Sequence, residues 1–191
     1  MKKAYLLLFL CLINCSKTEK NQLKPVSVKE FKEFVNATGY ETDAEKYGWS
    51  IVQVNVFDFE IVNVANWLKP DGKNPSLDSL PVTQVSYKDA IEYCKWANVS
   101  LPTYEKYWEI VKNDKRPIVS DNKSPISSVE KVNIVGNVWD ITETINSDKV
   151  RLAGGSLFCS RDTCHGTQKD RELYVDKETG NLHIGFSVLT Q

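Results

Sequence analysis

Helical periodicity occupies only three short stretches of this sequence, and the remainder has to fold as strands, turns and loops. The helices expected from the spacing of apolar residues cover residues 28–37, 87–98 and 104–111. Ser27 and Glu30 stand at the spacing of a capping box, and so do Ser86 and Asp89. Thr103 is the expected N-cap of the third segment. The chain therefore has clear helix start signals but little continuous helix.

The segments between these helices indicate short strands and long connections. Ile51–Phe57 alternates and is rich in β-branched residues, which predicts a strand, and Ile61–Val64 predicts a second short one. Asp71–Pro75 is a turn sequence, and Lys112–Lys131 is a long polar stretch expected to form a surface loop. After Ile134 we expect short strands and turns. The pattern favours an α+β single domain with two or three helices and much irregular structure.

The composition excludes a few broad classes of function. The chain has 191 residues, 41% of them hydrophobic and 26% charged, with a formal net charge of −1. This is the composition of an ordinary globular domain. It lacks the excess of basic side chains that a nucleic-acid partner requires, so we expect no nucleic acid among its partners.

The first residues have the features of an export signal. A short basic head is followed by the apolar run Ala4–Ile13, which is too short to span a bilayer. The segment ends at Cys15 and resembles a bacterial lipoprotein signal, although Asn14 departs from the small residue usual before the cysteine. We therefore expect a signal peptide at 1–14, a lipid-bearing Cys15 with a polar tether over 15–25, and a folded domain over 26–191. The alternative is a plain secretory peptide cleaved a few residues later. Both alternatives export the mature protein, and the lipid-anchored form is expected in the bacterial cell envelope.

Two of the remaining cysteines are candidates for chemistry. Cys159 and Cys164 are five residues apart, and a turn between them is needed before their sulfurs can meet. Three interpretations stay open: a disulfide of an exported protein, a pair of thiolates that binds Cu(I), or a reactive thiol activated by the adjacent Arg161. Cys94 lies on the apolar face of its helix and is expected in the core.

The other polar residues give weaker signals. Ser156 follows two glycines but has no histidine near it in the sequence, so a hydrolytic triad is unsupported and a structural hydroxyl is expected. His183 is expected at an ordinary surface or core position, and His165 borders the cysteine loop. The segment Asn133–Asp140 offers hard oxygen ligands of the kind that hold Ca²⁺, but a turn packed around a buried Trp139 is the favoured interpretation of that segment alone.

Taken together in order, several fragments resemble the formylglycine-generating enzyme family, also called sulfatase-modifying factors. The fragments are Ser27–Gly48, Pro81–Ala90, Tyr93–Ala97, Leu101–Glu109, Gly136–Asp140, Arg151–Ser156 and Gly185–Phe186. Each is weak by itself, but the collinear set covers most of residues 27–189. The resemblance implies a loop-rich fold distantly related to C-type lectins.

The resemblance also implies chemistry at the cysteines. In the enzymes of this family, two cysteines that follow Gly-Gly-Ser bind Cu(I) and, with O₂, oxidise a cysteine in a Cys-x-Pro-x-Arg segment of a sulfatase to formylglycine. Cys159 and Cys164 fall at those two positions, and Ser156 matches the active-site serine. A calcium site of the family corresponds to four residues of this chain: Asn133, Gly136, Val138 and Asp140.

Several departures from the family pattern weaken the expectation of catalysis. Lys112–Lys131 replaces several dozen residues that carry another calcium site, and the hairpin before the first helix is missing. Asp140 stands where the family has glutamate, Ile141 replaces a tryptophan and Ser187 replaces an arginine. His165–Gln168 replaces a stretch rich in arginine.

Two functional hypotheses follow. The first is an envelope-anchored, copper-dependent oxidase that converts a protein or peptide cysteine to formylglycine, with Cys159, Cys164 and Ser156 as its site. The second is a non-catalytic envelope binding or assembly module on the same fold, in which Cys159–Cys164 is a disulfide. The second also fits the location, because sulfatase cysteines are normally modified before the sulfatase folds.

Overall fold

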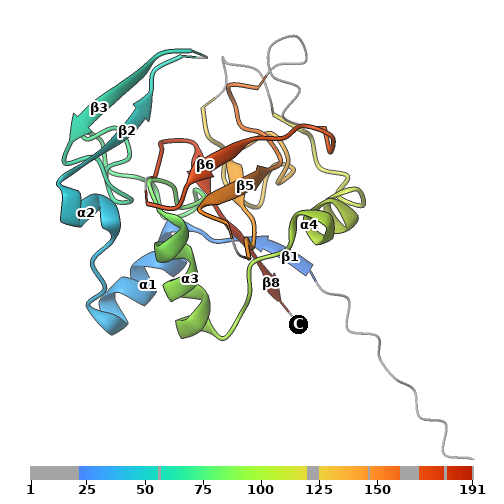
Figure 1. Cartoon of the computed structure of the whole chain (residues 1–191), viewed down its shortest axis with the longest axis horizontal. Coiled ribbons are helices and arrows are strands. Elements are labelled where there is room, and N and C mark those ends of the chain that lie inside the picture. The colour runs from blue at the N-terminus through green and yellow to red at the C-terminus, as the bar shows by residue number, and fades with distance from the viewer. Residues whose placement is uncertain are drawn as a thin grey trace, which may run out of the picture.

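The protein has an α+β fold in which helices surround small sheets (Figure 1). The computed structural model describes residues 22–55, 57–119, 125–145, 147–159, 168–178 and 180–190. The helices of these residues are α1 Val28–Thr38, α2 Asp43–Tyr47, α3 Tyr87–Ala97 and α4 Tyr104–Val111. The strands are β1 Gln22–Pro25, β2 Trp49–Gln53, β3 Phe59–Asn63, β4 Trp139–Ile141, β5 Lys149–Ala153, β6 Tyr174–Asp176, β7 Ile184–Gly185 and β8 Ser187–Thr190.

The strands form three separate sheets. β1 pairs with β8 and β2 pairs with β3, each as an antiparallel two-stranded ribbon. The third sheet has the strand order β6-β5-β4-β7, and within it β4 and β7 run parallel. No helix of the described residues is long and apolar enough to cross a membrane.

β1 corrects the predicted boundary of the tether. Residues 22–25 were expected to belong to a polar tether, but they form a strand in which Leu23 lies opposite Leu189 of β8. The chain then continues into the core, where the Val26 amide donates to the Phe186 carbonyl at 3.1 Å. The folded domain therefore begins at or before Gln22. The expected signal peptide (1–14) and Cys15 lie outside the described residues.

The predicted helices are confirmed together with their caps. Ser27 and Ser86 each accept from the backbone three residues on, and both capping boxes are complete. Thr103 caps α4 as expected. The sequence analysis missed α2, although Thr42 and Glu45 form a third capping box there.

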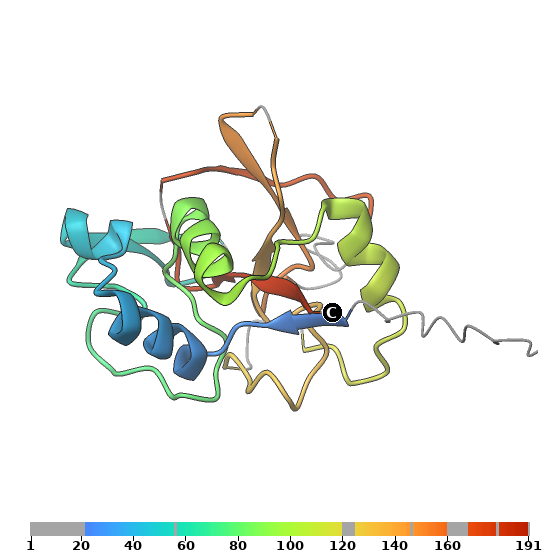
Figure 2. The same cartoon turned by 90° about the horizontal axis from the view of Figure 1, so that it is seen from below.

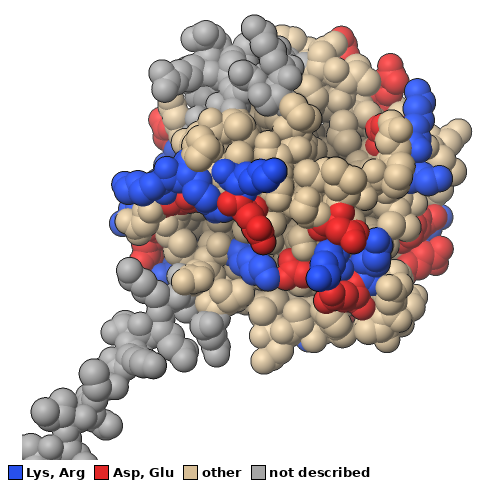
Figure 3. All heavy atoms as spheres, turned by 180° about the vertical axis from the view of Figure 1, so that it is seen from behind, with Lys and Arg blue, Asp and Glu red and all other residues tan. Residues whose placement is uncertain are grey.

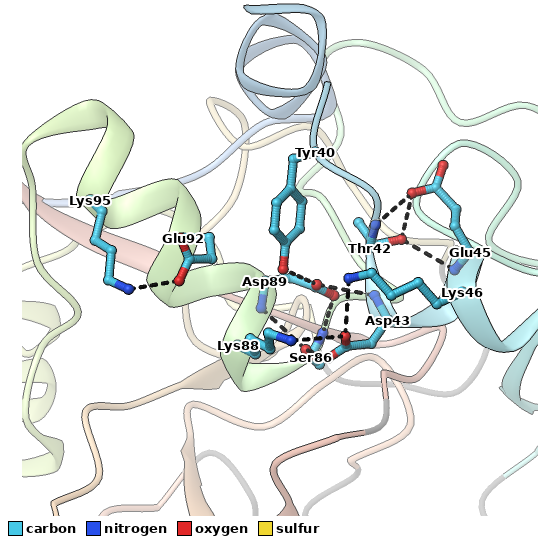
Figure 4. A network of polar contacts seen from close by, with 10 residues as sticks. All are labelled: Tyr40, Thr42, Asp43, Glu45, Lys46, Ser86, Lys88, Asp89, Glu92 and Lys95. Carbon is cyan, nitrogen blue, oxygen red and sulfur yellow. Dashed lines mark hydrogen bonds and ion pairs between the residues drawn. The ribbon is translucent and has the colours of Figure 1, made fainter. Parts of the chain in front are cut away.

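A buried polar network joins α2 to the start of α3 (Figure 4). The Asp89 carboxylate accepts from the Tyr40 hydroxyl at 3.0 Å and from the Asp43 amide at 3.1 Å. The Ser86 hydroxyl donates to the Asp43 carboxylate at 2.7 Å. A short helix of five residues is unstable by itself, so these bonds explain why α2 forms here.

The strand predicted over 51–57 is shifted. β2 begins at Trp49 and its pairing ends at Gln53, opposite Phe59 of β3. The reason is Asn55, whose side-chain oxygen accepts from the Phe57 and Asp58 amides at 3.0 and 3.1 Å and so forms a turn. The predicted surface loop is confirmed for residues 112–119 and 125–131, which contain no helix or strand.

An aromatic cluster fills the main core between α1, α3 and the C-terminal strands. The Phe31 ring contacts Phe34 and Trp67 edge-on at centroid distances of 5.3 Å, and Tyr93 and Phe186 close the cluster. Cys94 is buried beside it, as expected, and is a free thiol. Edge-on contacts of this kind add to the free energy gained by burial.

The side chain of Gln84 fastens the β2–β3 hairpin to the rest of the domain. Its oxygen accepts from the Ser50 hydroxyl at 2.5 Å, and its nitrogen donates to the carbonyls of Ile51 and Pro70 at 3.0 and 2.7 Å. Gln84 is fully buried and has a left-handed backbone, with φ of 60°. Gly180 packs against it so closely that an added Cβ would lie 2.5 Å from the Gln84 carbonyl carbon.

The hairpin and the first strand lie on opposite sides of the molecule. In Figures 1 and 2 the β2–β3 hairpin lies at the left, whereas the N-terminal end of β1 is directed to the right. On the face seen in Figure 3, basic and acidic side chains are interspersed and form no large patch of one sign.

We predict that Gln84→Ala lowers the free energy of unfolding by about 2–3 kcal/mol, because it removes the hydrogen bonds that this buried amide makes to the Ser50 hydroxyl and to the Ile51 and Pro70 carbonyls. Urea unfolding followed by tryptophan fluorescence measures this change. The exposed Gln168→Ala variant is the matched control and should be neutral. An unchanged midpoint for Gln84→Ala would show that the hairpin does not depend on this side chain.

Candidate functional site

A pocket of about 340 Å³ lies between the β2–β3 hairpin and the four-stranded sheet. The hairpin contributes Phe57 and Phe59, and the sheet side contributes Trp139 and Leu152. Three of the polar or sulfur-bearing residues in its wall are Ser156, Cys159 and His183. Two of these are residues that the sequence analysis selected, and the pocket brings a third beside them.

Ser156 and His183 form a buried hydrogen bond. The Ser156 oxygen lies 2.7 Å from Nδ1 of His183, although 27 positions separate the two residues in the sequence. Both side chains are buried. Burial lowers the pKa of His183 to about 3, so the imidazole is neutral at physiological pH. His183 thus lies in the core, one of the two positions expected for it, and the fold also makes it the partner of Ser156, which was not predicted.

Two local features place this pair. Gly154 and Gly155 both have positive φ, at 87° and 73°, and turn the chain from β5 toward the pocket. A Cβ on Gly154 would also lie 2.1 Å from the Tyr107 hydroxyl oxygen, so only glycine fits there. On the other side, the Trp139 amide donates to the His183 carbonyl at 2.8 Å and fixes the histidine against β4.

The pair does not have the geometry of a hydrolytic site. Ser156 is fully buried, and its hydroxyl oxygen lies within hydrogen-bond distance of both His183 Nδ1 and the Phe158 amide. A neutral Nδ1 that accepts from the hydroxyl leaves the ring proton on Nε2. Ser156 and His183 are therefore suited to hold a fixed hydrogen-bonding pattern at the end of the pocket rather than to supply a nucleophile.

Cys159 stands one turn after Ser156. Its amide donates to the Ser156 carbonyl at 2.8 Å, and the residue is only 3% exposed. Its sulfur is in a disulfide bond. Because the other described cysteine, Cys94, is a free thiol, the partner of Cys159 lies outside the described residues, as does the predicted site residue Cys164.

Thiolate sulfur is a ligand that suits Cu(I). A disulfide and a pair of reduced thiolates are two redox states of the same residues, so the oxidised state of Cys159 fits both a copper site and a structural bridge. What the described residues supply is one sulfur in the wall of a largely apolar pocket that His183 also lines. Copper binding by Cys159 and Cys164 stays a prediction, because Cys164 lies outside the described residues.

The residues predicted to bind calcium are engaged with other protein groups. The Asn133 oxygen accepts from the Val135 amide at 2.9 Å, and its nitrogen lies 3.2 Å from the Asp114 carbonyl. Asp140 is buried and accepts from the Ser187 hydroxyl at 2.5 Å. Among the described residues, no three acidic, histidine or cysteine side chains gather around a common point. Calcium binding by Asn133, Gly136, Val138 and Asp140 stays a prediction, and it requires Asp140 to be ionised.

Asp140 and Ser187 are two of the residues at which the chain departs from the family pattern, and they contact each other. Burial raises the pKa of Asp140 to about 7, against the smaller opposing effect of the hydrogen bond from Ser187. At these two positions the resemblance implies a longer acid and an arginine, and this chain has a shorter acid and a small hydroxyl instead.

We predict that Asp140 makes the folded state less stable as the pH rises from about 4 to about 7. The folded state keeps the proton to a higher pH than the unfolded chain does, so the unfolding free energy falls across that range. In Asp140→Asn this contribution is absent, so the stability of the variant relative to wild type should be higher at pH 8 than at pH 5. Urea unfolding at the two pH values tests this.

His183 has the opposite pH dependence in both proteins, so the difference between wild type and Asp140→Asn isolates the carboxyl group. The variant Asp148→Asn, at an exposed position, is the control. Its unfolding free energy should differ from that of wild type by the same amount at both pH values. A difference for Asp140→Asn that does not change with pH would contradict the prediction.

Comparison with known proteins agrees with the fold. Residues 22–113 match the sulfatase-modifying factor enzyme 1-like domain. A mouse (Mus musculus) formylglycine-generating enzyme is 28% identical over 84% of this chain and 63% of its own length. The formylglycine-generating enzyme of Thermomonospora curvata is 40% identical over 44% of this chain and 34% of its own length. The inactive Cα-formylglycine-generating enzyme 2 of Bos taurus is 27% identical over 77% of this chain and 67% of its own length.

The chain thus spans less than two thirds of the length of the mouse and Thermomonospora curvata enzymes. Among solved structures, the crystal structure of CarF aligns with a TM-score of 0.47 at 13% identity, over 88% of this chain and 83% of that one. Residues 22–113 therefore resemble the sulfatase-modifying factor enzyme 1-like domain, and the chain is similar, over most of its length, to a formylglycine-generating enzyme.

Proposed function

We propose that this protein is an exported, lipid-anchored oxidase that uses copper and O₂ to convert a protein or peptide cysteine to formylglycine. One observation carries the proposal: Cys159 and Ser156 lie together in the wall of one pocket, in a chain similar to formylglycine-generating enzymes. Cys159 and Cys164 are the proposed copper ligands, and the copper would supply the activation of O₂.

The proposed reaction balances as follows. A thiol carbon becomes an aldehyde, the sulfur leaves as H₂S, and one oxygen atom of O₂ ends in the aldehyde while the other ends in water. The balance requires two further electrons and two protons, which an external thiol reductant supplies by forming a disulfide.

The contribution of the protein is to bind and orient. Apolar side chains such as Phe59, Trp139 and Leu152 line the pocket and limit the access of water to the reacting sulfur. Neutral His183 fixes the Ser156 hydroxyl through the 2.7 Å hydrogen bond between Nδ1 and Oγ. The Ser156 oxygen is then held in one orientation beside Cys159.

A second candidate function is a non-catalytic envelope module, and the disulfide at Cys159 favours it. The similarity to relatives named as inactive is compatible with it as well. In this case the pocket would bind a partner segment, and the cysteines would only stabilise its wall.

Copper binding separates the two candidates. We expect the reduced chain, residues 16–191, to bind one Cu(I) in competition with a chelator, and we expect the Cys159→Ala, Cys164→Ala double variant to lose this binding. Conversion of a peptide thiol to an aldehyde, detected by hydrazide labelling, should then require copper, O₂ and reductant. Weak copper binding shared by both proteins would overturn the oxidase and leave the binding module.

The anchor has its own test. We expect the full-length protein to fractionate with membranes and to be labelled by a radioactive fatty acid, and we expect Cys15→Ala to lose the label. The Cys11→Ala variant is the control, because the proposed cleavage removes that residue. A label that persists in Cys15→Ala would refute lipid attachment at this position.

A further inference from the structure

We propose that the pocket selects an extended peptide segment with apolar side chains beside the reacting residue, and that it disfavours a basic side chain there. This inference names the substrate class of the proposed oxidase and in that sense rests on the proposed function, although the same segment would be the ligand of a binding module.

The pocket belongs to a longer groove. A neighbouring hollow of about 450 Å³ is lined by residues of β2, β3, β5, β6 and the segment before β7. The residues that line both hollows are Phe59, Val175, Asn181 and Ile184. The two hollows therefore adjoin each other along these four residues. We treat them together as one groove, with Ser156, Cys159 and His183 in the wall of the first hollow. A groove of this length accommodates several residues of an extended chain rather than a single side chain.

The hairpin wall of the groove is unusually apolar for an exposed surface. Phe57, Phe59 and Ile61 alternate along the chain and are 78%, 56% and 71% exposed. Phe59 lies opposite Gln53, which lines the pocket, and Ile61 lies opposite Ile51, which lines the neighbouring hollow. The strand face with these side chains is thus directed toward the groove. Large apolar side chains exposed together mark a surface that a partner covers.

The opposite wall favours an extended partner. β6 is an edge strand of the described four-stranded sheet, and Val175 of β6 lines both hollows. A peptide that lies along such an edge can use its own backbone for hydrogen bonds and place alternate side chains in the groove.

The charges of the groove decide the chemistry of these side chains. No Asp or Glu is among the described residues that line the pocket, where the charged residue is Arg171 and His183 is neutral. In the neighbouring hollow, Lys149 and Asp176 carry opposite charges. A basic side chain next to the reacting residue would therefore lose its hydration, meet the like charge of Arg171 and find no carboxylate among the described residues that line the pocket.

The test measures binding without turnover. Three fluorescent peptides of equal length carry serine in place of the reacting cysteine, flanked by phenylalanine and valine, by two arginines, or by two glutamates. Their anisotropy is measured with the full-length oxidised protein without copper. We expect the apolar peptide to bind at least about tenfold more tightly than the arginine peptide. Equal or tighter binding of the arginine peptide, or binding of none of the three, would overturn the proposal.

Variants locate the binding site. We expect Phe59→Ser to weaken binding of the apolar peptide about tenfold, and we expect Leu77→Ser to leave it unchanged. Leu77 is 66% exposed and lies outside the groove, so the two substitutions remove similar exposed apolar surface. Equal thermal unfolding midpoints exclude a folding defect. Unchanged binding by Phe59→Ser would overturn the placement in this groove.

The outcome is independent of copper. If the copper titration fails while the peptide selectivity holds, the oxidase is refuted and the groove serves the binding module. If copper binds but the selectivity fails, the substrate inference alone is refuted.

Discussion

The candidate pocket depends on the way one buried amide, the side chain of Gln84, connects three parts of the chain. It bonds to Ser50 and Ile51 of the hairpin and to Pro70 of the following loop, while its backbone amide donates to the Asn181 carbonyl at 3.1 Å. A two-stranded hairpin has little stability of its own, so its position has to come from such contacts. Since the hairpin forms one wall of the pocket, the shape of the site follows from this connection.

The buried polar residues of the domain do different kinds of work. Asp89 is satisfied by several donors and holds α2 against α3. Asp140 has the Ser187 hydroxyl as a partner, and burial raises its pKa to about 7. His183 is neutral as well, but it is directed at the pocket and fixes Ser156. Neutral groups are less costly to bury than charged ones, and this explains how a domain with few ion pairs in its interior keeps ordered polar contacts.

Much of the fold could be predicted from local signals. Ser27, Ser86 and Thr103 mark the helix starts, because a cap is a contact between residues three apart. The cap of α2 was equally visible in Thr42 and Glu45 and was overlooked. β1 could not be predicted, since its partner β8 is at the other end of the chain. The contact between Ser156 and His183 could not be predicted for the same reason. It depends on how β7 lies beside β4, and the local sequence around either residue does not indicate the other.

The opposite positions of β1 and the β2–β3 hairpin determine how the proposed anchored form would face its surroundings. Between a lipid on Cys15 and the first residue of β1 lie seven residue steps, which reach at most about 25 Å when fully extended. A domain joined to the membrane by so short a linker, with its groove on the side away from that linker, would present the groove outward from the membrane. Such an orientation favours peptide substrates or partners that arrive from the aqueous compartment over those embedded in the same leaflet.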